Sequence, residues 1–188
     1  MKRSAIPAIL AVVRTYLRNR TLGGTYFFTV NLAERQGNTL LTDNIDLLRE
    51  AFRRTLAEYP VAMDAIVVLP DHLHCLWRMP EGDDNYASRW RLIKAGFSRA
   101  MAKGERQSAS RLRKGERGIW QRRYWEHLIR DETDYARHVD YIHYNPVKHG
   151  YVAQARDWPY STFPRWVERG VYTEGWGVGN DVRDMNWE

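Results

Sequence analysis

The stretch AIVVLPDHLHCLW, residues 65–77, decides the fold prediction. Its first five residues form a short apolar run rich in β-branched side chains, which is typical of a buried strand. Pro70 interrupts this run, and a second strand-like segment follows over residues 72–78. Two strands this close in sequence favour antiparallel pairing. The sequence therefore predicts a β-hairpin.

The second strand of this hairpin carries two histidines. Side chains alternate along a strand, so His72 and His74 share one face while Leu73 points to the other. Two neutral imidazoles on one face can bind a divalent metal ion and leave positions open for a substrate phosphate. A His-x-His pair taken alone is a signal of low specificity, and ordinary surface histidines are the alternative.

The remaining elements alternate between strand and helix patterns. Further strands are predicted over residues 25–33, 62–69 and 119–130, and helices over about 43–59, 86–103 and 131–144. The polar, basic segment 104–117 lacks periodicity and is predicted to be a loop. These elements predict a single α+β domain with a central antiparallel sheet and helices packed on it.

The predicted helix over 131–144 has a second notable feature. Its core stripe contains His138, Val139 and Ile142, and Tyr141 falls outside this stripe. Asn145 follows Tyr141 by one helical turn, so a tyrosine nucleophile beside an amide metal ligand is one interpretation. The other is an ordinary helix tyrosine and an Asn cap before a proline.

Positive charge is concentrated in one part of the chain. The whole sequence has a net charge of +6, but residues 89–123 hold twelve Lys and Arg against two Glu. Such a cluster favours a polyanion, although it can also be a solvated face. The candidate phosphate-binding residues are Arg89, Arg91, Lys94, Arg111, Arg113, Lys114, Arg122 and Arg123. The candidate base-stacking residues are Trp120, Tyr124 and Trp125, with core packing as the alternative for both tryptophans.

Two observations bear on the cellular compartment. Cys75 is the single cysteine and cannot form an internal disulfide, which favours a reducing compartment. The apolar part of residues 1–20 is too short to span a bilayer and is followed by arginines, so this segment is predicted to be a basic arm. We expect a cytoplasmic protein with no membrane partner.

Several motifs together resemble one known family. The segments PDHLHCLW, GIWQRRYWEH, HVDYIHYNPVKHGYV and DWPYSTF occur in the order found in REP-associated tyrosine transposases. These are relatives of the HUH-class insertion-sequence transposases, named for histidine–hydrophobic–histidine. GGTYFFTVNL and PEGDDNYASRWRLIK also fit, so the resemblance extends over residues 21–176 and leaves a tail at 177–188.

The resemblance implies a ferredoxin-like HUH fold and a set of roles. His72, His74 and Asn145 would bind Mg²⁺ or Mn²⁺, and Tyr141 would be the nucleophile that forms a 5′-phosphotyrosine. The implied substrate is single-stranded DNA with repetitive extragenic palindromic (REP) hairpins, cut by a protein expected to be a monomer, with a dimer left open. His127 would be structural or would support the metal ligands.

Three other functions are compatible with parts of the sequence. A non-catalytic module that binds hairpin DNA or RNA would use the same basic segment and aromatic residues. Another HUH nuclease, such as a relaxase or replication initiator, would share the histidine pair and could use Tyr144 as a second tyrosine. A small-molecule metallohydrolase would need additional His or Asp ligands, and none stands at a recognisable spacing.

Overall fold

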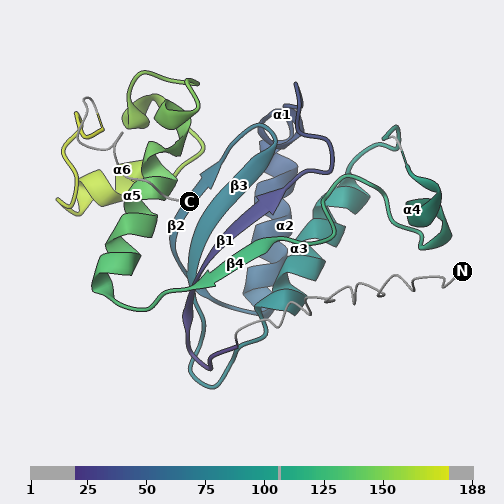
Figure 1. Cartoon of the computed structure of the whole chain (residues 1–188), viewed down its shortest axis with the longest axis horizontal. Coiled ribbons are helices and arrows are strands. Elements are labelled where there is room, and N and C mark those ends of the chain that lie inside the picture. Colours follow the sequence, from purple (N-terminus) through teal and green to yellow (C-terminus); the bar gives the residue numbers. More distant parts are fainter. Residues whose placement is uncertain (1–19, 106, 178–188) are drawn as a thin grey trace, which may run out of the picture.

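A computed structural model describes residues 20–105 and 107–177. It contains a four-stranded antiparallel sheet with helices on both faces, which confirms the predicted α+β fold (Figure 1). The strands are β1 (Thr25–Asn31), β2 (Ala62–Val68), β3 (His72–Arg78) and β4 (Trp125–Leu128), in the order β2-β3-β1-β4. The predicted arm at 1–20 and tail at 177–188 lie almost wholly outside the described residues.

The β2–β3 hairpin forms where the sequence predicted it. Val67 lies opposite His74 in the antiparallel register, and the Leu69 amide donates to the His72 carbonyl across the turn. β3 also pairs with β1 along its full length, with Thr29 opposite His74. The histidine pair is therefore on an interior strand of the sheet.

One face of the sheet is covered by the first helical layer. Its helices are α1 (Leu40–Asp43), α2 (Ile45–Glu58) and α3 (Tyr86–Ala100), and α2 and α3 lie side by side in Figure 1. Phe28, Cys75 and Trp77 point into this layer, and the Trp77 and Trp90 rings stack with centroids 4.4 Å apart. Aromatic packing of this kind stabilises the larger of the two cores.

The other face carries the C-terminal helices, α5 (Glu132–Lys148), η1 (Ala155–Asp157) and α6 (Phe163–Glu168). Alternation along β1 sends Phe27 into this layer, where it packs with Leu76, Val139 and Ile142. The same alternation along β3 places His72 and His74 on the α5 face. Among the described residues, no helix has the length and apolar character needed to cross a membrane.

Three sequence predictions about element boundaries were wrong. The predicted strand over 119–130 is regular only as β4, because Trp120 makes a single bridge to Leu32 and the chain then bends. The predicted loop 104–117 contains a short helix, α4 (Ala109–Arg113), whose start is capped by the Ser108 side chain. The third error concerns the end of α5.

Helix α5 continues through Asn145 and Pro146 instead of stopping before them. A proline in a helix removes one backbone hydrogen bond, but burial of Asn145 and Pro146 against the sheet accompanies this continuation. The helix ends at Lys148, two residues after Pro146, in a Schellman motif. Gly150, with φ of 72°, allows the Tyr151 amide to donate to the Pro146 carbonyl at 2.9 Å.

Candidate active site

The two histidines of β3 lie next to each other on the α5 face of the sheet. Each is only 3% exposed, and their ring centroids are 4.9 Å apart. This is the arrangement that alternation along a strand predicts. The first requirement of a two-imidazole metal site, a shared face, is therefore met.

Hydrogen bonds at the other ring nitrogen orient both imidazoles. His72 Nδ1 lies 2.5 Å from the Asp71 carboxylate, which only accepts hydrogen bonds, so Nδ1 carries the proton and Nε2 keeps a lone pair. Arg35 Nε donates to the same carboxylate at 2.6 Å. A carboxylate behind a histidine is the usual support for a metal-binding imidazole.

His74 is held in a similar way by β1. Its Nδ1 lies 2.9 Å from the Thr29 hydroxyl, and its buried Nε2 has no hydrogen-bond partner among the described residues. A buried polar atom without a partner is costly unless a ligand completes it. Burial lowers the pKa of His74 well below its usual range, so this imidazole is neutral and able to bind a metal ion.

Helix α5 presents a second row of side chains to this pair. Tyr141, Asn145 and His149 are spaced four residues apart and share one side of the helix. The Tyr141 ring lies 5.1 Å from the His74 ring, and the His149 ring lies 5.4 Å from the His72 ring. Asn145, between them in the row, therefore faces the histidine pair.

The Asn145 amide is completely buried, and both its oxygen and its nitrogen lack a hydrogen-bond partner among the described residues. It is not a helix cap, because α5 runs past it. Asn145 and His74 Nε2 are thus buried polar groups on facing elements that have no hydrogen-bond partner among the described residues. Tyr144 on the same helix is buried towards Trp176, so it is not available as a second nucleophile.

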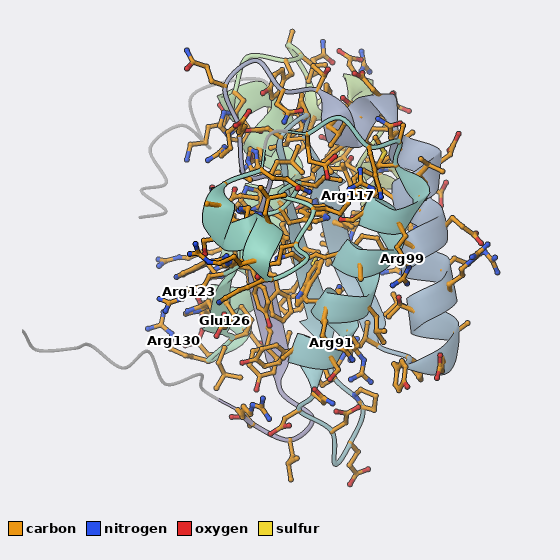
Figure 2. All side chains as sticks on the ribbon, turned by 90° about the vertical axis from the view of Figure 1, so that its right-hand side faces the viewer. Arg91, Arg99, Arg117, Arg123, Glu126 and Arg130 are labelled. Atoms are coloured by element: carbon orange, nitrogen blue, oxygen red, sulfur yellow. The ribbon has the colours of Figure 1, made fainter. Side chains whose placement is uncertain are left out.

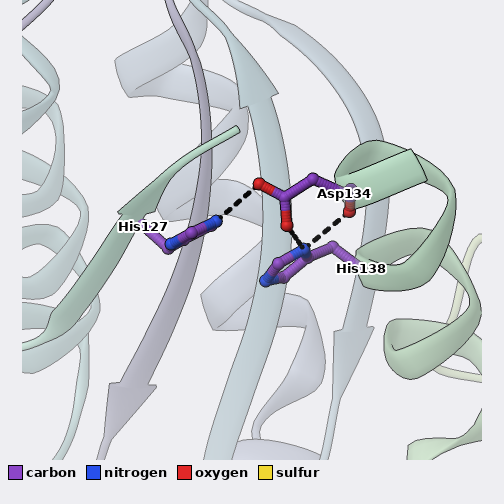
Figure 3. Close-up of side chains that lie close together, drawn as sticks. All are labelled: His127, Asp134 and His138. Carbon is purple, nitrogen blue, oxygen red and sulfur yellow. Dashed lines mark hydrogen bonds and ion pairs between the residues drawn. The ribbon is translucent and has the colours of Figure 1, made fainter. Parts of the chain in front are cut away.

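A second cluster of metal-type ligands lies where β4 meets α5 (Figure 3). His127, Asp134 and His138 bring their ligand atoms within 4.8 Å of one another. Sequence reasoning missed this cluster; the i, i+4 spacing of Asp134 and His138 was the available signal, but the contact with His127 is tertiary.

The hydrogen bonds of this second cluster are already satisfied within the protein. His127 Nε2 lies 2.8 Å from the Asp134 carboxylate, and His138 Nδ1 lies 2.8 Å from the Asp134 carbonyl. Arg130 Nε donates to the same carboxylate at 3.0 Å. Although burial acts in the opposite direction, hydrogen bonds from Arg130 and His127 hold the pKa of Asp134 well below its usual range. The cluster thus resembles a structural clasp more than an open metal site.

The structure separates the predicted DNA-binding residues into free and engaged groups. The prediction for Arg89 was wrong, because its guanidinium is 3% exposed and bonds to Asp83 and to the Tyr59 and Pro60 carbonyls. Trp120 and Tyr124 are buried in the core, which excludes base stacking on their rings.

The remaining predicted cations differ in how freely they can reach a ligand. Lys94 and Arg111 donate to backbone carbonyls of the 120–122 segment, and Arg122 is paired with Glu116. Exposed side chains are found at Arg91, Arg113, Lys114 and Arg123. Trp125, the third predicted stacking residue, is 49% exposed.

A His–hydrophobic–His pair on an interior antiparallel strand, next to a tyrosine on the covering helix, is the arrangement typical of HUH-class tyrosine enzymes. The chain is 50% identical over 169 residues to a Haemophilus influenzae protein assigned to the REP-associated tyrosine transposases, covering 89% of this chain and 96% of that protein. It is 47% identical over 171 residues to the REP-associated tyrosine transposase of Escherichia coli K12, covering 91% and 94%. The chain belongs to the REP-associated tyrosine transposases.

Structural comparison agrees with this assignment. A solved REP-associated tyrosine transposase bound to a REP hairpin superimposes with a TM-score of 0.78 at 46% identity, covering 93% of this chain and 96% of that one. No protein-family model matches the chain.

Proposed function

We propose that this transposase cuts single-stranded DNA beside a REP-type hairpin, with Tyr141 as the nucleophile. The observation that carries the proposal is the position of the Tyr141 ring, 5.1 Å from the ring of His74, whose Nε2 is buried without a partner among the described residues. A nucleophile next to a group able to bind a metal ion is the arrangement that phosphoryl transfer requires.

A divalent metal ion, Mg²⁺ or Mn²⁺, fits this site. The atoms that would bind it are Nε2 of His72, Nε2 of His74 and the Asn145 amide oxygen. The support for this assignment is that His74 Nε2 and the polar atoms of the Asn145 side chain have no hydrogen-bond partner among the described residues. Two imidazole ligands suit Mn²⁺ better than Mg²⁺, which prefers oxygen. When bound, the ion would polarise the scissile phosphate and hold it in place for attack.

The bond changes follow from the nucleophile. The Tyr141 Oη loses its proton and forms a bond to phosphorus, while the bond from phosphorus to the 3′ oxygen breaks. The products are a 5′-phosphotyrosine and a free DNA 3′-OH. A 3′-OH can later attack the phosphotyrosine and displace Tyr141, so strands are rejoined without nucleotide hydrolysis.

The hairpin itself is proposed to bind the basic face formed by α3, α4 and the start of β4. Figure 2 shows Arg91 and Arg99 along α3, with Arg123 and Arg130 beside β4. A cavity of about 580 Å³ lies between α3 and the segment before β4, and Arg91 and Arg99 are among its lining residues. Cations on one face attract the DNA backbone independently of sequence. The relative that was solved with a REP hairpin supports the choice of ligand.

We propose that the transposase acts as a monomer on chromosomal DNA, and therefore in the bacterial cytoplasm at the nucleoid. The support for a monomer is that the histidine pair on β3 and the tyrosine on α5 meet within one chain. A second copy of the chain is not needed to supply the nucleophile.

The test is a covalent-adduct assay. Labelled single-stranded oligonucleotides carrying REP hairpins are incubated with Mn²⁺ or Mg²⁺ and resolved on a denaturing protein gel. We expect an adduct with the wild type and with Tyr144→Phe, the matched control on the same helix, but none with Tyr141→Phe. Tight hairpin binding without an adduct under either metal would favour the non-catalytic binding module instead.

A further inference from the structure

Two exposed aromatic side chains lie on opposite sides of the active site. Trp125, at the start of the edge strand β4, is 49% exposed, and Tyr151, just after α5, is 44% exposed. Single exposed apolar side chains are common on folded surfaces, so it is the position of these two rings beside the candidate site that argues for a role. Neither residue has a role in the chemistry described above.

On the β4 side, a single ring separates Trp125 from the reacting groups. The Trp125 and Phe27 rings are 5.6 Å apart. Phe27 in turn lies 5.9 Å from the Tyr141 ring and 5.5 Å from the His74 ring. Since Phe27 is buried, it fixes the distance from Trp125 to the nucleophile without being available to a ligand itself.

On the opposite side, His149 makes the equivalent connection. Its ring lies 5.4 Å from the His72 ring and 5.9 Å from the Tyr151 ring. Tyr151 stacks on Trp158 at 5.4 Å, and its backbone is held by the Schellman motif that ends α5. Tyr151 is therefore a rigidly supported ring with almost half of its surface open to solvent.

Positive charge accompanies both rings. Arg123 is exposed two residues before Trp125, and Arg130, which follows β4, is exposed although it also pairs with Asp134. At the active site, Lys148 Nζ lies 5.0 Å above the Tyr141 ring, and the half-exposed Arg35 holds Asp71. Alternating aromatic rings and cations are the usual surface for single-stranded nucleic acid, whose bases stack while its phosphates pair with the cations.

We propose that Trp125 and Tyr151 are stacking platforms for the unpaired bases on the two sides of the scissile phosphate. The inference rests on the proposed function, because it takes the phosphate to lie at Tyr141. The two platforms would extend the DNA across the histidine pair and present a single phosphodiester to the tyrosine. They also make the site selective for single strands, since paired bases do not expose their faces for stacking.

The test measures binding without cleavage, in the Tyr141→Phe background. One probe is a DNA hairpin with an unpaired tail of roughly ten nucleotides, within the usual size of a single-strand site. The second probe is the same hairpin without its tail. Trp125→Ala and Tyr151→Ala are each expected to weaken binding of the tailed probe about 5- to 140-fold, the range that corresponds to the loss of one stacked base.

Three controls make the result specific. The tailless hairpin should bind each alanine variant as it binds the parent. Trp125→Phe and Tyr151→Phe should retain most of the affinity, because a stacking ring remains. Tyr59→Ala removes another exposed tyrosine, at the end of α2 and outside this chain of rings, and should change neither affinity.

The position of the bases is read out with 2-aminopurine placed on either side of the cleavage position. Its fluorescence is quenched by stacking, and each alanine variant should relieve quenching on one side only. The proposal would be overturned if the alanine variants lost equal affinity for the tailed and the tailless hairpin, or if their affinity for the tailed hairpin were unchanged. An absent covalent adduct in the wild type would count against the nuclease function, whereas loss of stacking alone would leave that function standing.

Discussion

At the scale of single residues, the orientation of the two histidines depends on the side chains behind them. Asp71 accepts from His72 Nδ1 and is itself held by Arg35, so it determines which nitrogen of His72 is left for the proposed metal ion. Thr29 does the same for His74. Sequence patterns identified the two histidines, but these supporting residues became visible only from the register of β1 and β3.

Replacing Asp71 by Asn should weaken metal binding while the fold remains intact. The amide keeps the shape but loses the charge that makes the His72 imidazole a better ligand, and such changes cost about 10- to 100-fold in metal affinity. The measurement is a Mn²⁺ titration by calorimetry. Asp64→Asn is the matched control, since Asp64 also pairs with an arginine but lies at the far end of the hairpin. Equal Mn²⁺ affinity in the two variants would contradict this role of Asp71.

At the scale of elements, the attachment of α5 to the sheet determines where Tyr141, the proposed nucleophile, lies. The His127–Asp134–His138 clasp joins β4 to the first turns of α5, and the His127 and His138 rings stack at 4.7 Å. Tyr141 lies one turn beyond His138 on the same helix. The clasp therefore sets the position of α5 relative to β1 and β3.

Asp134→Asn should destabilise the protein without removing its metal site. Loss of the carboxylate charge weakens the contacts of this buried side chain with His127, Arg130 and His138. We expect this to lower the free energy of unfolding by about 1–3 kcal/mol. Urea denaturation measures this change, and a Mn²⁺ titration on the same variant should match the wild type. A lost Mn²⁺ site in this variant, with His72→Ala still binding the ion, would identify the clasp as the metal centre instead.

At the scale of the whole molecule, charge is distributed unevenly over the surface. Arg113 and Lys114 on and after α4 are exposed, whereas Arg49 and Arg53 on α2 are equally exposed but paired with acidic neighbours. Of these two regions, α4 and α2, only α4 therefore presents unbalanced positive charge to a DNA backbone.

Reversing Arg113 and Lys114 to Glu should weaken hairpin binding and flatten its salt dependence. Each lost phosphate contact lowers the slope of log affinity against log salt by about one, so the double variant should lose about two. Fluorescence anisotropy over a salt series provides the slopes. The double variant Arg49→Glu with Arg53→Glu makes the same change in net charge on α2, and an equal effect there would mean that only net charge matters.

Stability should also fall with acid because of a buried histidine. His143 is fully buried between α5 and α6, and burial lowers its pKa to about 3. In the unfolded chain the His143 imidazole takes up a proton near pH 6.5, whereas in the folded protein it stays neutral down to about pH 3. The free energy of unfolding therefore falls by about 1.4 kcal/mol for each pH unit between these two values and is unaffected by His143 above pH 6.5. Urea unfolding at several pH values should show a shallower decline in His143→Gln. An identical decline in both proteins would show that His143 does not titrate as proposed.

Sequence reasoning succeeded wherever the signal was local. The hairpin and the shared face of His72 and His74 follow from strand periodicity. Tyr141, predicted to lie outside the core stripe of its helix, is instead partly buried against the core on the α5 side. Sequence reasoning failed at the end of α5, because a proline is a local signal for termination and burial of the last turn outweighed it. It failed also for Arg89, whose charge is buried by contacts with the chain between α2 and α3.

The sequence by itself therefore determined the α+β architecture and the shared face of the histidine pair, since backbone periodicity decides which side chains share a face. Periodicity left the role of Tyr141 open, and only the family motif indicated it as the nucleophile. Only the tertiary structure decided that Tyr141, Asn145 and His149 face that pair, which cations remain free for DNA, and that Trp125 and Tyr151 stand on either side of the site. The physical reason is that burial and pairing depend on residues far apart in the chain, and these meet only when the helices pack on the sheet.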